Sequence, residues 1–193
     1  MQAHCKGVPR KLLQHLLHLP VRQSCRFDSH CVNGERSPSG MRYAVKEIEM
    51  KKASSHSGSC FCGAVQFTVS DEPVAMGYCH CDSCRHWSAG QVNAFTLWKP
   101  DAVRVTRGAD LIGTYHKTER SNRKWCKSCG GHVFTEHPGW GVIDVYAAVI
   151  PGFRFTPSLH VNYQETVLRI KDGLPKLKDY PKEMGGSGEI VPE

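Results

Sequence analysis

Short runs in which apolar and polar residues alternate dominate the chain from residue 57 onward. Residues 64–69 alternate, are rich in β-branched side chains and are followed by Asp-Glu-Pro, which predicts a strand closed by a turn. The same pattern predicts further strands at 91–98, 102–106, 111–116, 122–126, 132–136, 142–149 and 165–170. No run between 57 and 150 has helical periodicity of useful length. The predicted fold class is therefore mainly β, built from short strands.

Two pairings are expected among these strands. The turn signal around Gly108 predicts that 102–106 pairs with 111–116. Residues 122–126 and 132–136 flank a Cys-x-x-Cys-Gly-Gly sequence, whose glycines are placed for a tight turn.

The first 49 residues have a different composition. No acidic residue precedes Asp28, basic residues are scattered among His and Leu, and 12–17 are expected to form a short amphipathic helix that ends at Pro20. Three readings stay open: a transit-like presequence, a disordered or loosely docked extension, and a start codon assigned too early, because Met50-Lys-Lys-Ala resembles an ordinary start. We expect this segment to contribute nothing to the chemistry.

Charge gives no case for a nucleic-acid partner. The chain of 193 residues has a formal net charge of +7, but residues 50–193 hold 17 basic and 14 acidic side chains, a charge of +3. Seven thiolates around two Zn²⁺ ions would contribute −3 and leave that part near neutral. No apolar run approaches the ~18 residues needed to cross a bilayer. The prediction is a cytoplasmic protein with neither a nucleic-acid nor a membrane partner.

The chain has ten cysteines, which favour metal binding over disulfides. Cys-x-Cys pairs are too close for easy bridging, and Cys-x-x-Cys pairs in a chain without an export signal more often bind metal. Seven cysteines cluster and are the candidate ligands. The other three match no ligand spacing and are expected to be free thiols: Cys5, Cys25 and Cys31.

Three of the seven lie within six residues, at Cys79, Cys81 and Cys84. Three thiolates are one short of the tetrahedral shell that zinc prefers, and an open fourth position is typical of a catalytic site. Two flanking pairs, Cys60/Cys62 and Cys126/Cys129, would supply the four sulfurs of a closed structural site. Spacing alone does not say which pairs share a metal, but this division is favoured because it leaves the compact triple intact.

Three motifs together resemble a known family. They are Gly58-Ser-Cys-Phe-Cys-Gly-Ala-Val-Gln-Phe, then Cys79-His-Cys-Asp-Ser-Cys-Arg-His-Trp-Ser-Ala-Gly, then Trp125-Cys-Lys-Ser-Cys-Gly-Gly. In this order they resemble the glutathione-dependent formaldehyde-activating enzyme family, which also includes centromere protein V. The resemblance covers roughly 57–187 and leaves 1–56 as an N-terminal extension and 188–193 as a tail.

The resemblance implies a zinc-stabilised β-tent with two zinc ions per chain. It assigns a structural zinc to Cys60, Cys62, Cys126 and Cys129, and a catalytic zinc to Cys79, Cys81 and Cys84. The implied reaction joins glutathione, or a related small-molecule thiol, to formaldehyde and gives S-(hydroxymethyl)glutathione, formally a carbon–sulfur lyase in reverse. We favour attack by a thiolate held at the three-sulfur site over polarisation of the aldehyde by the metal.

Two other functions stay open: a non-catalytic zinc-stabilised binding module of the centromere protein V type, and a redox or metal-storage site. Among the remaining candidates, His80 could be a proton shuttle or an alternative ligand, but a histidine that lies behind the ligands or is exposed to solvent is favoured. We expect His86 and His132 to be structural, and Trp87, Phe95 and Trp125 to form core or pocket wall. Three basic residues could hold substrate carboxylates but are better explained as solvated: Arg85, Arg123 and Lys124. The sequence does not indicate an oligomeric state.

Overall fold

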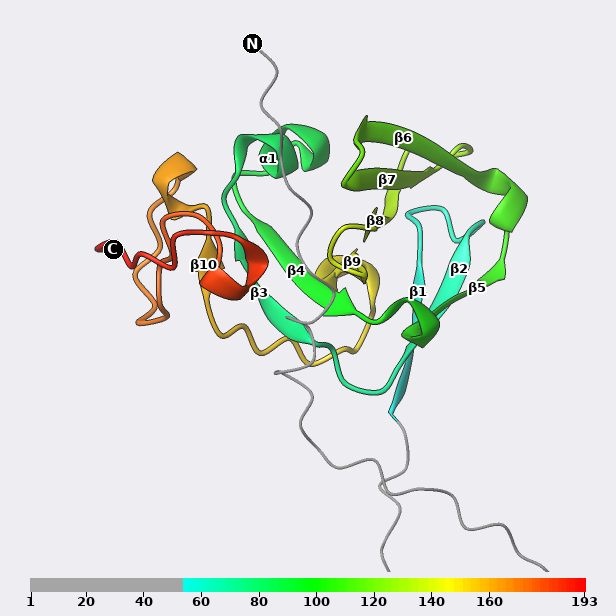
Figure 1. The fold of residues 1–193 in the computed structure, drawn as a ribbon. Coiled ribbons are helices and arrows are strands. Elements are labelled where there is room, and N and C mark those ends of the chain that lie inside the picture. Colours follow the sequence, from blue (N-terminus) through cyan, green and yellow to red (C-terminus); the bar gives the residue numbers. More distant parts are fainter. Residues whose placement is uncertain (1–53) are drawn as a thin grey trace, which may run out of the picture. The chain divides into compact units, whose positions relative to one another are not determined.

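The computed structural model describes residues 54–193, so the helix expected at 12–17 and the readings of the first 49 residues lie outside the described residues. The described part is mainly β, which confirms the predicted fold class (Figure 1). Its strands and single α-helix are β1 (Ser55–Ser59), β2 (Gln66–Ser70), β3 (Ala75–Cys79), α1 (Asp82–Ser88), β4 (Asn93–Trp98), β5 (Val103–Arg107), β6 (Ile112–Thr118), β7 (Ser121–Cys126), β8 (His132–His137), β9 (Val142–Tyr146) and β10 (His160–Val161).

The strands form two sheets. A three-stranded sheet has the order β1-β2-β5, and a seven-stranded sheet has the order β10-β3-β4-β9-β8-β7-β6. Neighbouring strands are antiparallel except for β10, which runs parallel to β3. The predicted pairing of 122–126 with 132–136 is confirmed, because β7 and β8 are antiparallel neighbours around the cysteine turn.

The predicted pairing of 102–106 with 111–116 is wrong. Both segments are strands, but β5 pairs with β2 in the small sheet and β6 pairs with β7 in the large one. Gly108 has a φ of 70°, and the 3₁₀ turn after it leads the chain out of one sheet into the other instead of closing a hairpin. A side chain at Gly108 would collide with the carbonyl of Ala64, so the close approach also requires glycine.

The strand predicted at 165–170 is also wrong. This segment follows a 3₁₀ turn at Tyr163–Glu165 and has no strand partner. Val167 and Leu168 are exposed, and the N–H of Ile170 donates to the Tyr163 hydroxyl at 3.0 Å. The edge of β3 that such a strand could have joined is already occupied by β10. The strand predicted at 142–149 is shorter, since β9 ends at Tyr146 and a 3₁₀ turn follows.

Two apolar clusters form the core. The larger contains Phe67, Trp98 and Val145 together with Cys60 and Cys126, so two candidate ligands are part of the hydrophobic interior. The smaller contains Cys79, Phe95 and Val161, with Cys81, Cys84 and Tyr180 packed against it. Each cysteine group therefore lies against its own cluster. No helix within residues 54–193 is long and apolar enough to cross a membrane.

The C-terminal segment lies beside β3 and β10 (Figure 1). Backbone hydrogen bonds join its successive parts: His160 N–H donates to Pro175, Lys178 N–H to Glu189 and Val191 N–H to Lys176. Residues 188–193, set apart as a tail by the sequence, are thus hydrogen-bonded to the domain. These pairings bring residues from 160–193 next to the Cys79–Cys84 motif.

A buried chain of polar side chains runs from that motif into the C-terminal segment. His80 Nε2 lies 2.8 Å from His160 Nδ1, and His160 Nε2 lies 2.9 Å from the Asp172 carboxylate. Because an ionised carboxylate only accepts, His160 Nε2 carries the proton, and its Nδ1 accepts from His80 in the neutral ring. Lys176, whose side chain is 1% exposed, pairs with Asp172 and also donates to Glu193 at 2.8 Å.

Asp172→Asn is expected to destabilise the domain by about 1–3 kcal/mol at pH 7, because it removes one of the two counter-charges of the buried Lys176 ammonium and Glu193 remains. Burial raises the pKa of Asp172, but hydrogen bonds from Lys176 and His160 outweigh it and hold the pKa below its ordinary 3.8. A lowered pKa means that the stabilisation is present above pH 3.8 and is lost as the pH falls further. The change in free energy of unfolding is measured by urea titration at pH 7.

The matched control is Glu189→Gln, which removes the exposed partner of Lys178. Exposed pairs contribute about 0–1 kcal/mol, so this variant should unfold near the wild-type midpoint. Equal midpoints for the two variants would contradict the assigned role of Asp172.

Candidate metal centres

Four sulfurs converge where the loop after β1 meets the β7–β8 turn. The Sγ atoms of Cys60, Cys62, Cys126 and Cys129 all lie within 4.8 Å of one another. The Cys60 and Cys62 sulfurs are 3.7 Å apart, and the Cys62 and Cys126 sulfurs are 4.0 Å apart. The two pairs are about 65 positions apart in the sequence and meet at one point, as expected from the division of the seven cysteines into a group of four and a group of three.

Backbone amides point at two of these sulfurs. Val65 N–H donates to Cys60 Sγ at 3.3 Å, and Gly131 N–H donates to Cys129 Sγ at 3.4 Å. The amide of Gly131 is the main reason that the pKa of Cys129 falls to about 6. Gly130 reaches a φ of 72°, the left-handed conformation that the tight turn requires. Through these amides the loops favour the thiolate forms of Cys60 and Cys129, the forms that bind metal.

Three other sulfurs converge where β3 leads into α1. The Sγ atoms of Cys79, Cys81 and Cys84 lie within 4.8 Å of one another, and no further His, Cys, Asp or Glu of residues 54–193 joins the group. Cys79 ends β3, Cys81 is the N-cap of α1, and Cys84 follows one turn later. Cys84 N–H donates to Cys81 Sγ at 3.3 Å, so the helix start itself brings these two sulfurs together.

Donors from elsewhere in the chain surround this triple. Hydrogen bonds from Cys79 and Cys84 lower the pKa of Cys81, and the positive charge of Arg123 lowers it further. Asn162 Nδ2 donates to Cys79 Sγ at 3.7 Å. Arg123, which is buried, donates to Cys84 Sγ at 3.8 Å and to Ser83 Oγ at 3.0 Å. The surroundings thus favour negative charge on Cys81, whereas hydrogen bonds with Cys81 and Cys84 raise the pKa of Cys79. The hydrogen bond with Cys79 lowers the pKa of Cys84, but the one with Cys81 and burial outweigh it and raise this pKa.

One face of the seven-stranded sheet carries polar side chains toward the triple. Directly opposite residues in neighbouring strands share a face. Cys79 is opposite Asn93, and Tyr146 is opposite Phe95, two positions along the same strand as Asn93. Asp144 is opposite Thr135, which is opposite Arg123. Cys79, Asn93, Tyr146, Asp144 and Arg123 therefore share a single face.

Three polar atoms on that face are buried and have no hydrogen-bond partner among the described residues: Asn93 Nδ2, Asp144 Oδ1 and Tyr146 OH. Burial raises the pKa of Asp144 to about 7, although Arg123 opposes this. Burial also raises the pKa of Tyr146, and the negative charges of Asp144, Cys84 and Cys79 add to the effect. Unpaired polar atoms are rare in protein interiors, and their concentration beside the triple fits a site that takes a further group.

The donor sets fit zinc in number and chemistry. Four mutually close thiols match a closed tetrahedral site, and three match a site with one open position. Both groups can therefore hold a metal ion.

Comparison with known proteins agrees with the motifs. The profile of the family described as "Glutathione-dependent formaldehyde-activating enzyme" matches residues 55–165, more than half of the chain. The chain belongs to this family.

Individual relatives match only part of this member of the glutathione-dependent formaldehyde-activating enzyme family. A Halomonas elongata protein, whose name assigns it provisionally as such an enzyme, is 32% identical over 89 residues, 43% of this chain and 57% of that protein. A Schizosaccharomyces pombe protein named an uncharacterised lyase is 28% identical over 79 residues, 41% of this chain and 56% of that protein. The matches thus span little more than half the length of these relatives. A crystal structure of a Rhodobacter sphaeroides protein aligns with a TM-score of 0.43 and 23% identity, over 51% of this chain and 90% of that one.

The three histidines that the sequence of this family member suggested as candidate site residues lie in different surroundings. His80 is fully buried and directed to His160 and Thr166, and burial lowers its pKa to about 4. Its ring nitrogens are thus engaged away from the triple. His132 stacks on Trp87 with ring centres 4.9 Å apart, and His86 is exposed.

The basic candidates also separate. Arg85 donates to the His80 carbonyl at 2.9 Å, and Lys124 pairs with Glu136 at 3.3 Å. Arg123 is buried against Trp87 instead of being solvated as the sequence analysis expected. Four polar residues of the site were missed: Asn93, Asp144, Tyr146 and Asn162. The available signal was the alternation in 91–98 and 142–149, which places Asn93, Asp144 and Tyr146 on one side of their strands but not next to the cysteines.

Proposed function

We propose that this protein is a zinc-dependent enzyme of the carbon–sulfur lyase type, which forms S-(hydroxymethyl)glutathione or a related adduct from a small-molecule thiol and an aldehyde. The observation that carries the proposal is the contrast between the two cysteine groups. One closes with four sulfurs, and the other offers only three among the described residues. Family membership and the names of two relatives support the same activity.

Each cysteine group has a role in this proposal. We assign one zinc to Cys60, Cys62, Cys126 and Cys129 as a structural site, and a second zinc to Cys79, Cys81 and Cys84 as the catalytic site. A zinc ion held by the triple would bind the sulfur of an incoming thiol at its open fourth position, as the nucleophilic thiolate at neutral pH. The free thiols of both groups suit a reducing compartment, for which we propose the cytoplasm.

The chain's own residues position the three sulfurs. Arg123 donates to Cys84 and Asn162 donates to Cys79. These hydrogen bonds fix the orientation of the two sulfurs, so that both stay directed at the centre of the group. The Arg123 guanidinium also contributes positive charge beside three thiolates. We expect these contacts to hold the three sulfurs beside the polar face of the sheet, where the aldehyde would approach.

The test is exchange between ¹³C-formaldehyde and its glutathione adduct, followed by NMR. The zinc-loaded protein is expected to speed this exchange above its spontaneous rate in buffer. A second measurement replaces zinc by cobalt, and adding glutathione should change the sulfur-to-cobalt absorption.

The outcomes separate the candidate functions. An exchange rate equal to that of buffer, with both sites filled and no change in cobalt absorption, would overturn the enzyme proposal. The domain would then be a zinc-stabilised binding module.

A further inference from the structure

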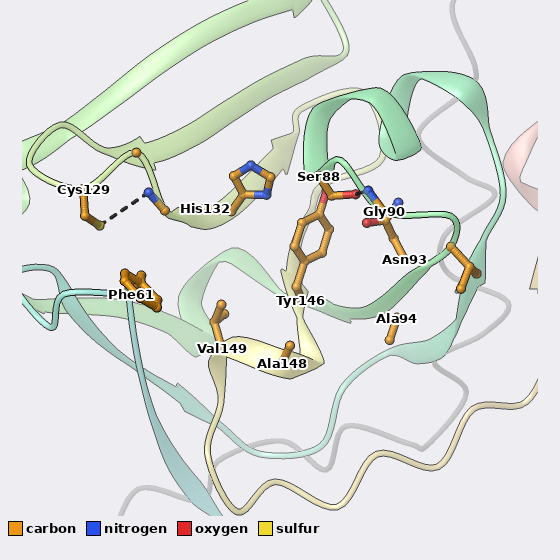
Figure 2. A pocket seen from close by; sticks show the side chains of 13 residues that line it. Phe61, Ser88, Gly90, Asn93, Ala94, Cys129, His132, Tyr146, Ala148 and Val149 are labelled. Carbon is orange, nitrogen blue, oxygen red and sulfur yellow. Dashed lines mark hydrogen bonds between the residues drawn. The ribbon is translucent and has the colours of Figure 1, made fainter.

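A cavity of about 610 Å³ lies between the turn after α1, the start of β4, the end of β9 and the β7–β8 turn (Figure 2). This volume is typical of small-molecule sites, which span about 300–1,000 Å³. Its walls include Cys129 of the four-cysteine group and Ser88, the last residue of the helix that also contains Cys84.

The cavity has no Lys, Arg, Asp or Glu in its walls, and the Cys129 sulfur in its wall belongs to the four-cysteine group. Apolar contributions come from Phe61, Val92, Ala94, Ala148 and Val149. The histidine in the wall, His132, is neutral at pH 7, because burial and then the Arg123 charge lower its pKa. Phe61 is 94% exposed and lies across the cavity from Asn93 (Figure 2). Such walls suit an uncharged carbon chain, whereas the carboxylates of glutathione would find no counter-charge inside.

Two residues of the walls each carry a buried hydrogen-bond donor that has no partner within residues 54–193. The donors are Asn93 Nδ2 and Tyr146 OH, and Asn93 is only 6% exposed. Figure 2 shows the Tyr146 ring extending from its strand toward the turn that contains Ser88 and Gly90. A buried donor is almost always paired in a working protein, and both groups match an oxygen acceptor.

These donors are also close to the triple. Asn93 is directly opposite Cys79 in the β3–β4 ladder, and Tyr146 shares its face of the sheet. The charges of Cys84 and Cys79 contribute to the raised pKa of Tyr146, after burial and Asp144. An oxygen bound by Asn93 and Tyr146 would therefore lie beside the site at which we propose that the thiol binds.

We propose that this cavity binds the carbon chain of an uncharged aldehyde larger than formaldehyde, with the carbonyl oxygen held by Asn93 and Tyr146. The inference rests on the proposed function, which supplies the thiol. During addition the S–C bond forms, the carbonyl π pair moves to the oxygen, and the proton lost by the thiol ends on that oxygen. No oxidant or reductant is required. The two donors stabilise the negative charge that develops on the oxygen.

The contribution of the two donors to the reaction is tested by the kinetics of a variant that lacks the Tyr146 hydroxyl. Tyr146→Phe is expected to lower kcat/KM for glutathione and butanal about a hundredfold, as loss of one donor to a developing oxyanion typically does. The matched control is Tyr115→Phe, because Tyr115 is an exposed residue outside the cavity. Zinc content and melting temperature should equal those of wild type in both variants. Asn93→Leu, of similar size, is the second variant and should also lower kcat/KM at unchanged zinc content.

A second experiment measures binding without turnover. Butyramide is an unreactive, uncharged analogue of butanal, and its binding to the zinc-loaded protein is followed by ligand-observed NMR. We expect saturable binding that is about tenfold weaker in Tyr146→Phe, the loss of one hydrogen bond. Ala148→Trp, at an exposed wall position, should lower the ratio of kcat/KM for butanal to that for formaldehyde.

The outcomes distinguish this inference from the proposed function. Thiol–formaldehyde activity without butyramide binding, or binding that Tyr146→Phe does not weaken, would overturn the inference and leave the proposed function standing. In the second case ordered water, not a substrate oxygen, pairs with the donors. Butyramide binding that depends on Tyr146, in a protein without thiol–aldehyde activity, would support the carbonyl site and overturn the proposed reaction.

Discussion

The Cys126→Ser variant is expected to be unfolded at room temperature. Cys126 is fully buried in the larger apolar cluster, and its group joins the loop after β1 to the β7–β8 turn, hence one sheet to the other. A structural zinc contributes about 10–16 kcal/mol of apparent binding energy, whereas a whole domain is stable by only about 5–15 kcal/mol. Losing this zinc therefore removes as much free energy as the folded state has. Far-ultraviolet circular dichroism and a urea titration provide the measurement.

The matched control is Cys31→Ser, which removes a cysteine outside both ligand groups. It should unfold at the wild-type urea midpoint and keep its zinc. A cooperative transition of Cys126→Ser at the wild-type midpoint would show that the four-cysteine group does not hold the fold together.

The Cys81→Ser variant is expected to fold and to retain about one zinc per chain instead of two, with thiol–aldehyde exchange at the spontaneous rate. Cys81 is partly exposed and caps α1 by accepting from Cys84 N–H. Serine is among the best N-cap residues, so the helix start survives while the sulfur ligand is lost. Zinc content by atomic spectroscopy, a urea titration and the exchange assay check the three parts of this expectation.

Cys81→Ala, which offers no oxygen ligand, should give the same zinc content and the same loss of exchange. Unfolding of both variants, or one zinc per chain in wild type, would instead make the triple structural. Such a result would favour the binding-module function. Retained exchange in a one-zinc variant would mean that the reaction does not take place at the triple.

Short-range chemistry made much of this protein predictable. The Cys-x-Cys and Cys-x-x-Cys spacings bring sulfurs together within a single turn, so the triple and the two flanking pairs could be recognised without knowing the fold. Only the fold brings the two pairs to one point. The turn between β7 and β8 could be predicted from residues 126–131 alone. Its glycines allow the left-handed backbone that directs the Gly131 amide at Cys129. Alternation of apolar and β-branched residues likewise predicted most strands and the mainly β class.

Contacts between distant segments were decided only in three dimensions. A period of two indicates which residues of a strand share a side, but not which strand lies next to it. The partner of β5 was therefore predicted wrongly. In the structure Val103 and Val105 of β5 lie opposite the buried Val69 and Phe67 of β2. The C-terminal chain that joins Asp172 and Lys176 to His80 depends on β10 pairing with β3, and no local pattern announces a pairing of two residues.

The division between sequence and tertiary structure is clearest at the candidate site. The sequence alone determined the cysteine motifs, the mainly β class and the family, because each depends on residue type and spacing within a few positions. Tertiary structure decided that the triple faces Asn93, Asp144 and Tyr146, and that Arg123 is buried beside it. The reason is that the register of five neighbouring strands, from β3 to β7 in the sheet order, is set by long-range packing and decides which polar side chains meet the three sulfurs.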